Sequence, residues 1–396
     1  MMNGTKKRLS YWILCVFCLS LLAACTTSQP GDGGTAVGGT NSTVTPTATS
    51  GGAKTTIPAE AFRAIRFVDH TYGWALTMDK VLRTADGGKT WVDMTKGGLS
   101  ASELAGGKTA QAVFQTANRA WVFITTPKTP AGITVHIWRT DDGGGNWYSA
   151  SFDDNEAIGF ADRPTFINIQ DGWVLLGTGA GAGSYGVHLY QTKDGGASWK
   201  QISAAPGTLP LSGEKAGPSF TDATTGWMAD HVAALDNAPL LYDSIDGGIS
   251  WAKEPLPLIS SYAEAHYRTT PPVTFDQVLI EPVHVSNGTQ KHLVMYVSGN
   301  GGAHWYPGQP AAFDTDNVYV IDDQGHWVAI DSGTVYRQDG KGNWVKAGTV
   351  PATAGPMSFI NAQEGWSLDT QSAALYHTTN GGTSWETINY NFVSAS

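Results

Sequence analysis

The chain has 396 residues, of which 15% are charged, and its formal net charge is −10. This acidic balance argues against a nucleic-acid partner, because the phosphate backbone attracts basic surfaces. The cysteines are Cys15, Cys18 and Cys25, so the remaining chain has no disulfide framework, zinc-binding cysteine cluster or catalytic thiol.

Residues 1–24 have the order of an export signal. Lys6, Lys7 and Arg8 precede an apolar run from Tyr11 to Leu22, and small residues follow. This run is too short and wrongly flanked for a membrane-spanning helix. Its end, "LLAAC", resembles the lipobox of bacterial lipoproteins, which implies cleavage before Cys25 and attachment of lipid to its sulfur. The alternative is an ordinary signal peptide with a chance cysteine.

Residues 25–57 follow the predicted cleavage point and consist almost entirely of Gly, Ser, Thr, Pro and Ala after Cys25. Such a composition buries too little apolar surface to offset the entropy of ordering, which predicts a disordered tether. We therefore expect the folded part, residues 58–396, to lie outside the cytoplasm. The lipid on Cys25 would hold it to the cell membrane, or to an outer membrane if the host has one.

A short motif, first seen as "TADGGKTW" from Thr84, occurs seven times. In every copy an Asp or Asn precedes a Trp by five residues, and successive copies are 39 to 56 residues apart. The pairs are Asp86/Trp91, Asp142/Trp147, Asp194/Trp199, Asp246/Trp251, Asn300/Trp305, Asp339/Trp344 and Asn380/Trp385. Self-similarity at this period predicts a propeller or a solenoid.

Each repeat unit has the pattern of four short strands. In the first unit these are 64–68, 74–78, 80–84 and 90–94, where apolar and β-branched residues alternate between Gly, Asp and Asn turns. A second Trp opens the second strand in six units, at Trp74, Trp121, Trp173, Trp227, Trp327 and Trp366. We predict an all-β fold, a seven-bladed β-propeller of four-stranded antiparallel blades over residues 58–396. The ring closes either by packing of complete blades or by pairing of the C-terminal "INYNFV" beside the first blade.

The repeated motif matches the Asp-box or BNR repeat, S/T-x-D-x-G-x-T/S-W. Its combination with a preceding "GW" strand resembles the BNR propellers of the photosystem II stability and assembly factor type. Sialidases, sortilin-type receptors and some xyloglucan-degrading enzymes carry the same box. The resemblance implies a sialidase-type propeller fold for nearly all of residues 58–390, but not a function, because site chemistry does not follow from fold.

The boxes are predicted to be structural. A short Asp or Asn side chain can accept hydrogen bonds from the N–H groups of a tight turn. Gly87 and Gly88 can adopt positive φ there, and Trp91 can pack between blades. Repetition in every blade is expected of an architectural element.

A functional site is expected among irregular loops. In sialidases the boxes lie away from the active site, so the resemblance favours the opposite face. There, the crossing "LISSYAEAHYRTTPP" from Leu258 combines aromatic, acidic and basic side chains. The candidate binding residues are Tyr262, Glu264, His266, Tyr267 and Arg268; the alternative is a solvated connector.

No metal or other cofactor is predicted. Asp153, Asp154 and Glu156 offer oxygen ligands for Ca²⁺, but they lack the spacing of a known cation loop.

Catalysis is uncertain and is not the favoured hypothesis. A sialidase-like site needs three arginines around a substrate carboxylate, and three of the eight arginines after residue 58, namely Arg83, Arg139 and Arg337, lie beside boxes. No carboxylate pair stands out for another glycosidase. We therefore predict a non-catalytic, membrane-anchored lipoprotein that binds a protein or glycan partner, or scaffolds an envelope complex. The alternative is a sialidase-like glycoside hydrolase that uses loops opposite the boxes.

Overall fold

The computed structural model describes residues 62–96, 99–106, 109–181, 183–230, 238–339, 341–351 and 355–394. The predicted signal peptide, Cys25 and the tether lie outside these residues. The folded residues belong to one compact unit, Gly52–Ser396. Among the described residues, no helix is long and apolar enough to cross a membrane.

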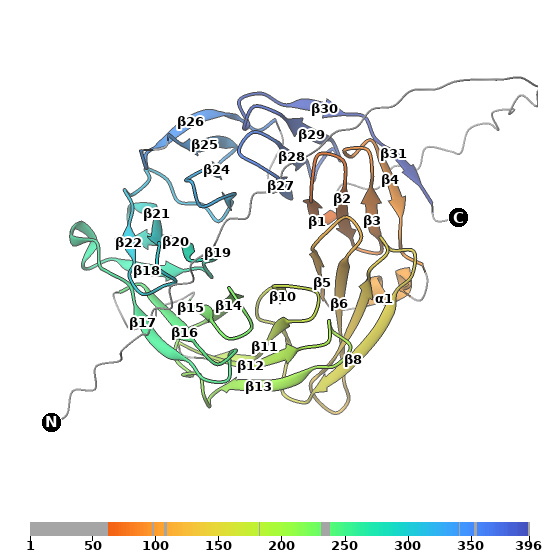
Figure 1. Cartoon of the computed structure of the whole chain (residues 1–396), viewed down its shortest axis with the longest axis horizontal. Helices are drawn as coiled ribbons and strands as arrows, with labels where there is room; N and C mark the ends of the chain where they lie inside the picture. Colours follow the sequence, from red (N-terminus) through yellow and green to blue (C-terminus); the bar gives the residue numbers. More distant parts are fainter. Residues whose placement is uncertain are drawn as a thin grey trace, which may run out of the picture. The chain divides into compact units, whose positions relative to one another are not determined.

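Seven β-sheets follow one another along the chain and form the blades of a β-propeller (Figure 1), which confirms the predicted fold class. Blade 1 contains β1 (Phe62–Phe67), β2 (Gly73–Thr77), β3 (Val81–Thr84) and β4 (Thr90–Asp93). Blade 2 contains β5 (Thr109–Phe114), β6 (Ala120–Pro127), β7 (Ile133–Thr140) and β8 (Tyr148–Asp154). Blade 3 contains β9 (Gly159–Phe160), β10 (Thr165–Phe166), β11 (Gly172–Gly181), β12 (Ser184–Thr192) and β13 (Lys200–Ala205).

The remaining blades repeat this order. Blade 4 contains β14 (Lys215–Phe220), β15 (Gly226–Asp230), β16 (Leu240–Ser244) and β17 (Ala252–Pro255). Blade 5 contains β18 (His266–Thr269), β19 (Val273–Phe275), β20 (Val278–Ser286), β21 (Lys291–Ser298) and β22 (Tyr306–Pro307). Blade 6 contains β23 (Val318–Val320), β24 (Trp327–Asp331), β25 (Thr334–Gln338) and β26 (Trp344–Thr349). Blade 7 contains β27 (Met357–Phe359), β28 (Gly365–Leu368), β29 (Leu375–Thr378) and β30 (Glu386–Ile388).

The ring is closed by the C-terminal segment, the second of the two closures considered. Strand β31 (Asn391–Val393) pairs in parallel with β4 and becomes the outer strand of blade 1. Tyr390 and Phe392 pack against a core cluster shared by blades 1 and 7, and the Tyr390 hydroxyl donates to the carbonyl of Ala373 at 2.7 Å. The last residues therefore join the last blade to the first.

An aromatic stack explains the repeated Gly-Trp pair. The Phe67 ring lies over Gly73 of its own blade, where an added Cβ would come within 2.7 Å of the ring. That ring also stacks on Trp366 of the preceding blade, with 3.8 Å between centroids. The glycine thus makes room for the phenylalanine, and the tryptophan uses it to hold two blades together.

Blade 2 shows what happens without the glycine. Its second strand begins with Ala120, and Phe114 and Trp74 are still parallel but 5.5 Å apart. The stacks of Trp121 on Phe166 and Trp173 on Phe220 keep centroid distances of 3.9 and 3.8 Å. Where Ala120 replaces the glycine, the two stacked rings are farther apart, but their separation remains within the range of favourable aromatic pairs.

In the described part of the chain, two short helices interrupt the β architecture. Helix α1 (Ala101–Gly106) lies between blades 1 and 2, and its buried Leu104 packs with the core between them. Ser100 and Glu103 exchange hydrogen bonds at its start, a capping box. The 3₁₀ helix η2 (Ser260–Tyr262) lies between blades 4 and 5.

Candidate functional site

In each repeated turn, the Asp or Asn side chain accepts hydrogen bonds from other residues of the same turn. In blade 3, Asp194 Oδ1 accepts from the Thr192 hydroxyl at 2.8 Å and from the Ser198 N–H at 2.9 Å. Its Oδ2 accepts from the Ser198 hydroxyl at 2.6 Å, while Thr192 Oγ1 accepts from the Gly196 N–H at 2.8 Å. Both carboxylate oxygens are used within one turn.

The same bond recurs in all seven copies. Oδ1 of the Asp or Asn accepts the N–H of the residue four positions later, at 2.8 to 3.1 Å, in Asp86, Asp142, Asp194, Asp246, Asn300, Asp339 and Asn380. Burial raises the pKa of Asp194, but hydrogen bonds from Ser198 and Thr192 outweigh it and hold the pKa below its usual value. A carboxylate kept ionised in this way is poorly suited to donate a proton.

The box tryptophans lie in the cores between blades. Trp91, Trp147 and Trp305 are buried, and the others are partly buried: Trp199, Trp251, Trp344 and Trp385. Trp147 Nε1 crosses to blade 1, where it donates to the carbonyl of Met94 at 2.8 Å. Packing of this kind leaves little aromatic face available to a ligand.

The second glycine of the box is needed for blade packing as well as for turn geometry. Gly88 has a φ of 92°, and an added Cβ would lie 2.8 Å from Leu375 of blade 7. Gly302 has a φ of 83°, and the corresponding distance to Trp227 of blade 4 is 2.9 Å. A larger residue would strain the backbone and push neighbouring blades apart.

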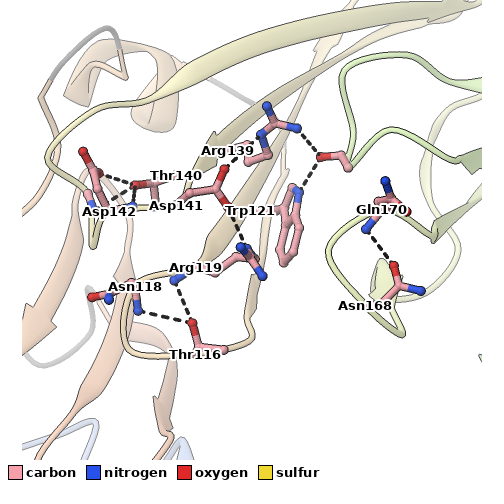
Figure 2. A network of polar contacts seen from close by, with 12 residues as sticks. Thr116, Asn118, Arg119, Trp121, Arg139, Thr140, Asp141, Asp142, Asn168 and Gln170 are labelled. Atoms are coloured by element: carbon pink, nitrogen blue, oxygen red, sulfur yellow. Dashed lines mark hydrogen bonds and ion pairs between the residues drawn. The ribbon is translucent and has the colours of Figure 1, made fainter.

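Arginines bridge neighbouring turns, a role that the sequence did not reveal. Figure 2 shows the junction of blades 2 and 3, where Trp121 Nε1 donates to the carbonyl of Gly195 at 2.8 Å. Arg139 Nη1 donates to the carbonyls of Asp194 and Gly195 at 3.1 and 3.2 Å. At the junction of blades 1 and 2, Arg83 Nε donates to the carbonyl of Ala117 at 2.8 Å.

The five residues of the candidate binding loop do not form one cluster. Glu264 and His266 are exposed at the start of blade 5. Tyr267 is only 3% exposed, its hydroxyl donates to the carbonyl of Tyr262, and burial raises its pKa. Arg268 Nη2 contacts Asp316 Oδ1 at 2.5 Å on the crossing to blade 6. Tyr267 therefore belongs to the core between blades, and Arg268 faces a neighbouring segment.

Two histidines join blades to the crossings on the face opposite the boxes. His188 Nδ1 lies 2.7 Å from Asp154 Oδ2, and its Nε2 lies 3.6 Å from Glu156. His284 has the same arrangement, with Nδ1 against Asp314 and Nε2 3.4 Å from Asp316. In each pair, the carboxylate that contacts Nδ1 is the more buried one. Neither histidine was identified from the sequence. Each contacts a pair of acids two residues apart, Asp154 and Glu156 or Asp314 and Asp316, and this spacing was visible in the sequence.

The suggested Ca²⁺ ligands point to different partners. Asp153 accepts from Lys128 and from Thr134, both at 2.6 Å, whereas Asp154 faces His188. In the part of the chain that the structure describes, no group of three His, Cys, Asp or Glu side chains is placed to hold a metal ion.

Glu281 is a buried acid in blade 5. It is fully buried in blade 5, neither carboxyl oxygen has a hydrogen-bond partner, and burial raises its pKa well above the usual value. A neutral carboxyl group is the form compatible with that environment.

A pocket of about 590 Å³ lies between blades 7 and 1, on the face of the repeated turns. It is lined by His70, Asp86, Gly87, Lys89, Glu364, Trp366, His377 and Glu386, with Thr387, Ile388 and Asn389. His377 Nε2 lies 3.1 Å from Glu364 Oε1, and its Nδ1 lies 3.4 Å from Glu386 Oε1. The ring also stacks on Trp366, with 4.6 Å between centroids. This pocket is not on the face that sequence reasoning favoured.

Known proteins resemble this chain in structure. No protein-family model matches the sequence, and no curated protein matches it. YCF48 from Cyanidioschyzon merolae is 16% identical over 85% of this chain and 87% of its own, with a TM-score of 0.36. The GH74 xyloglucanase from Xanthomonas campestris is 14% identical over 82% of this chain and 64% of its own, with a TM-score of 0.35. The BP39L lectin from Burkholderia pseudomallei is 13% identical over 82% and 98%, with a TM-score of 0.46. These likenesses concern the fold, and none assigns an activity to this chain.

Proposed function

We propose that this protein is a non-catalytic binding module, anchored outside the cytoplasm by lipid on Cys25, which binds a protein or glycan partner. The predicted leader and tether support the anchorage. A long tether would let a rigid propeller reach partners away from the membrane surface.

The observation that carries this proposal is that the box carboxylates and two histidines on the opposite face are bonded within the scaffold. Asp194 and its counterparts bond to their own turns, as described above. On the opposite face, His188 contacts Asp154, which accepts the N–H groups of Glu156 and Ala157 at the start of a crossing, and His284 contacts Asp314. Such pairs position loops, which is what a preorganised binding surface requires.

Catalysis is tested with a panel of chromogenic glycosides that includes a sialoside. The full-length protein, purified in detergent, is expected to hydrolyse none of them. Turnover that a single loop carboxylate substitution abolishes would overturn the proposal in favour of a glycoside hydrolase.

Anchorage and binding are tested in cells that produce the protein. Mass spectrometry should find lipid on Cys25, and Cys25→Ser should move the protein from the membrane fraction to the soluble fraction. Purified protein should bind a cell-surface protein or an arrayed glycan saturably. Protein that stays in the cytoplasm, or that binds neither class saturably, would contradict the proposal.

A further inference from the structure

The junctions between blades can be compared with one another because they are built from the same repeated parts. An added Cβ on Gly195 would lie 2.8 Å from Arg139 Nη1 of the preceding blade. The same construction on Gly143 comes within 3.2 Å of Arg83, and on Gly381 within 2.5 Å of Arg337 Nη1. At three junctions, therefore, a guanidinium group lies against the first glycine of the next turn.

The junction between blades 7 and 1 lacks this group, and so do the junctions of blades 3 and 4 and of blades 4 and 5, where the side chains of Gln191 and Gln277 lie within 4 Å of a Cβ added to the corresponding glycines. Within 4 Å of a Cβ added to Gly87, the described residues contribute only the backbone oxygen of His70, at 3.0 Å. No described side chain of blade 7 approaches that position, although Trp366 Nε1 still donates to the carbonyl of Gly87 at 3.2 Å. The hydrogen bond from the tryptophan to the next turn is therefore kept at this junction, whereas the guanidinium group is missing.

A histidine accounts for the difference. His377 is opposite Trp366 in the strand register, as Arg139 is opposite Trp121. Its imidazole is shorter than an arginine side chain, and Glu364 and Glu386 hold it within blade 7. The space that arginine fills elsewhere is consequently part of the pocket between blades 7 and 1.

We propose that this pocket binds the guanidinium group of an arginine side chain supplied by a partner protein. The inference rests on the proposed binding function and specifies the chemistry of one contact. The partner group is identified as a guanidinium because this chain places its own arginines in the equivalent position at three other junctions.

Residues whose counterparts at other junctions offer backbone acceptors to arginine line the pocket. Asp86 and Gly87 occupy the positions in their turn that Asp194 and Gly195 occupy in theirs, and the latter two carbonyls accept from Arg139. His70 likewise corresponds to Ala117, whose carbonyl accepts from Arg83. The repeat thus offers an entering guanidinium the same kind of backbone oxygen that receives it at other junctions.

Charge favours a cation in this pocket. The carboxylates of Glu364, Glu386 and Asp86 line it together with one ammonium group, that of Lys89. Glu386 has a 76% exposed side chain, so it stands at the entrance, whereas Glu364 is 21% exposed. A planar guanidinium, with five N–H donors, can bond to carboxylate and carbonyl oxygens at once, which a lysine ammonium does less well. The pocket volume also lies within the usual range of about 300–1,000 Å³ for ligand sites.

The test measures binding of three capped peptides to the full-length protein in detergent by isothermal titration calorimetry. They are acetyl-Gly-Arg-Gly-amide, its lysine analogue and its citrulline analogue, which keeps the shape of arginine without the charge. The arginine peptide should bind at a stoichiometry of one, roughly ten-fold more tightly than the lysine peptide, and the citrulline peptide should not bind measurably.

Two variants locate the site. His377→Arg should fill the pocket with the chain's own guanidinium and weaken arginine-peptide binding by at least about ten-fold, without loss of thermal stability. Glu386→Gln should weaken it by roughly the same factor by removing one charge. His304→Arg, a matched change at an exposed position of blade 5, should leave binding unchanged.

The proposal is overturned if the native protein does not bind the arginine peptide, if citrulline binds equally well, or if His377→Arg binds like the native protein. Binding of free arginine but not of the capped peptide would overturn the assignment to a protein side chain. If the protein captures a cell-surface partner equally well with and without His377→Arg, the proposed binding function stands and this inference alone fails.

Discussion

The junction between blades 2 and 3 and the junction between blades 7 and 1 share a framework but differ in what fills it. Both keep the Trp–Phe stack and the bond from the Trp indole to the next turn, by Trp121 in one and Trp366 in the other. Arg139 occupies the first junction, whereas the second contains a pocket and an additional strand, β31. The Trp–Phe stack and the indole hydrogen bond, which both junctions share, hold neighbouring blades together. The parts that differ between the junctions can serve ring closure or ligand binding.

The largest expected effect is the loss of a shared contact. Trp121→Ala and Trp366→Ala should each lower the free energy of unfolding by about 3–5 kcal/mol, because both side chains are essentially fully buried. Guanidinium-chloride denaturation followed by tryptophan fluorescence and circular dichroism measures this change. A loss below about 1 kcal/mol at either junction would break the comparison, since the stack would then not be a common requirement.

A smaller effect is expected from removing β31, which among the described strands is added only at the junction of blades 7 and 1. Deletion of Tyr390–Ser396 removes a three-residue ladder, the Tyr390–Ala373 hydrogen bond and the packing of Phe392. We expect a loss of about 2 kcal/mol, measured by thermal unfolding. Deletion of residues 395–396 alone is the control and should leave the unfolding temperature unchanged. Unchanged stability in the longer deletion would rule out β31 as a closing strand.

The repeated turns should contribute less again, and equally at both junctions. Asp194→Ala and Asp86→Ala should each lower the free energy of unfolding by about 1–2 kcal/mol, since each frees turn N–H groups. Asp194→Asn should cost less because Asn300 and Asn380 make the same bond. Loss of peptide binding in Asp194→Ala, with stability unchanged, would contradict a structural role for the boxes.

The same turns predict a dependence on pH. The pKa of Asp194 is lower in the folded protein than its usual value, so its ionised form stabilises the fold above the unfolded pKa. That contribution should disappear as the pH falls below about 4 and through the folded pKa. The stability advantage of the native protein over Asp194→Asn should therefore shrink on acidification, which urea denaturation from pH 7 to pH 3 can follow.

Sequence reasoning succeeded where the signal was repeated and local. Fixed spacing between Asp86 and Trp91, found again in every unit, predicted the seven blades. Helix α1 was missed because six residues are too few for a helical period, although Ser100 and Glu103 carried the capping signal. Local chemistry was present there, but no periodicity supported it.

Long-range pairing limited the prediction of the site. The partner of β31 lies about 300 residues earlier, and nothing local distinguishes a paired strand from a free terminus. The pocket likewise needs His377, Glu364 and Asp86 to meet across the closed ring. The substitution of His for Arg beside the last box was visible in the sequence, but its meaning required knowing where Arg139 points.

The smallest expected effect tests whether an open junction is sufficient for binding. Arg139→His should lower stability by only about 1 kcal/mol, because Trp121 still holds the turn and the side chain is partly exposed. It should open a space like that between blades 7 and 1, yet the stoichiometry of arginine-peptide binding should stay at one. The positions of Glu364 and Glu386 are occupied in blade 2 by Arg119 and Tyr148, which provide no carboxylate. If Arg119→Glu and Tyr148→Glu are added to Arg139→His, calorimetry should detect a second site. If no second site is detected, the space left by the arginine and two added carboxylates are not sufficient for binding, and the junction of blades 7 and 1 must contribute a further feature.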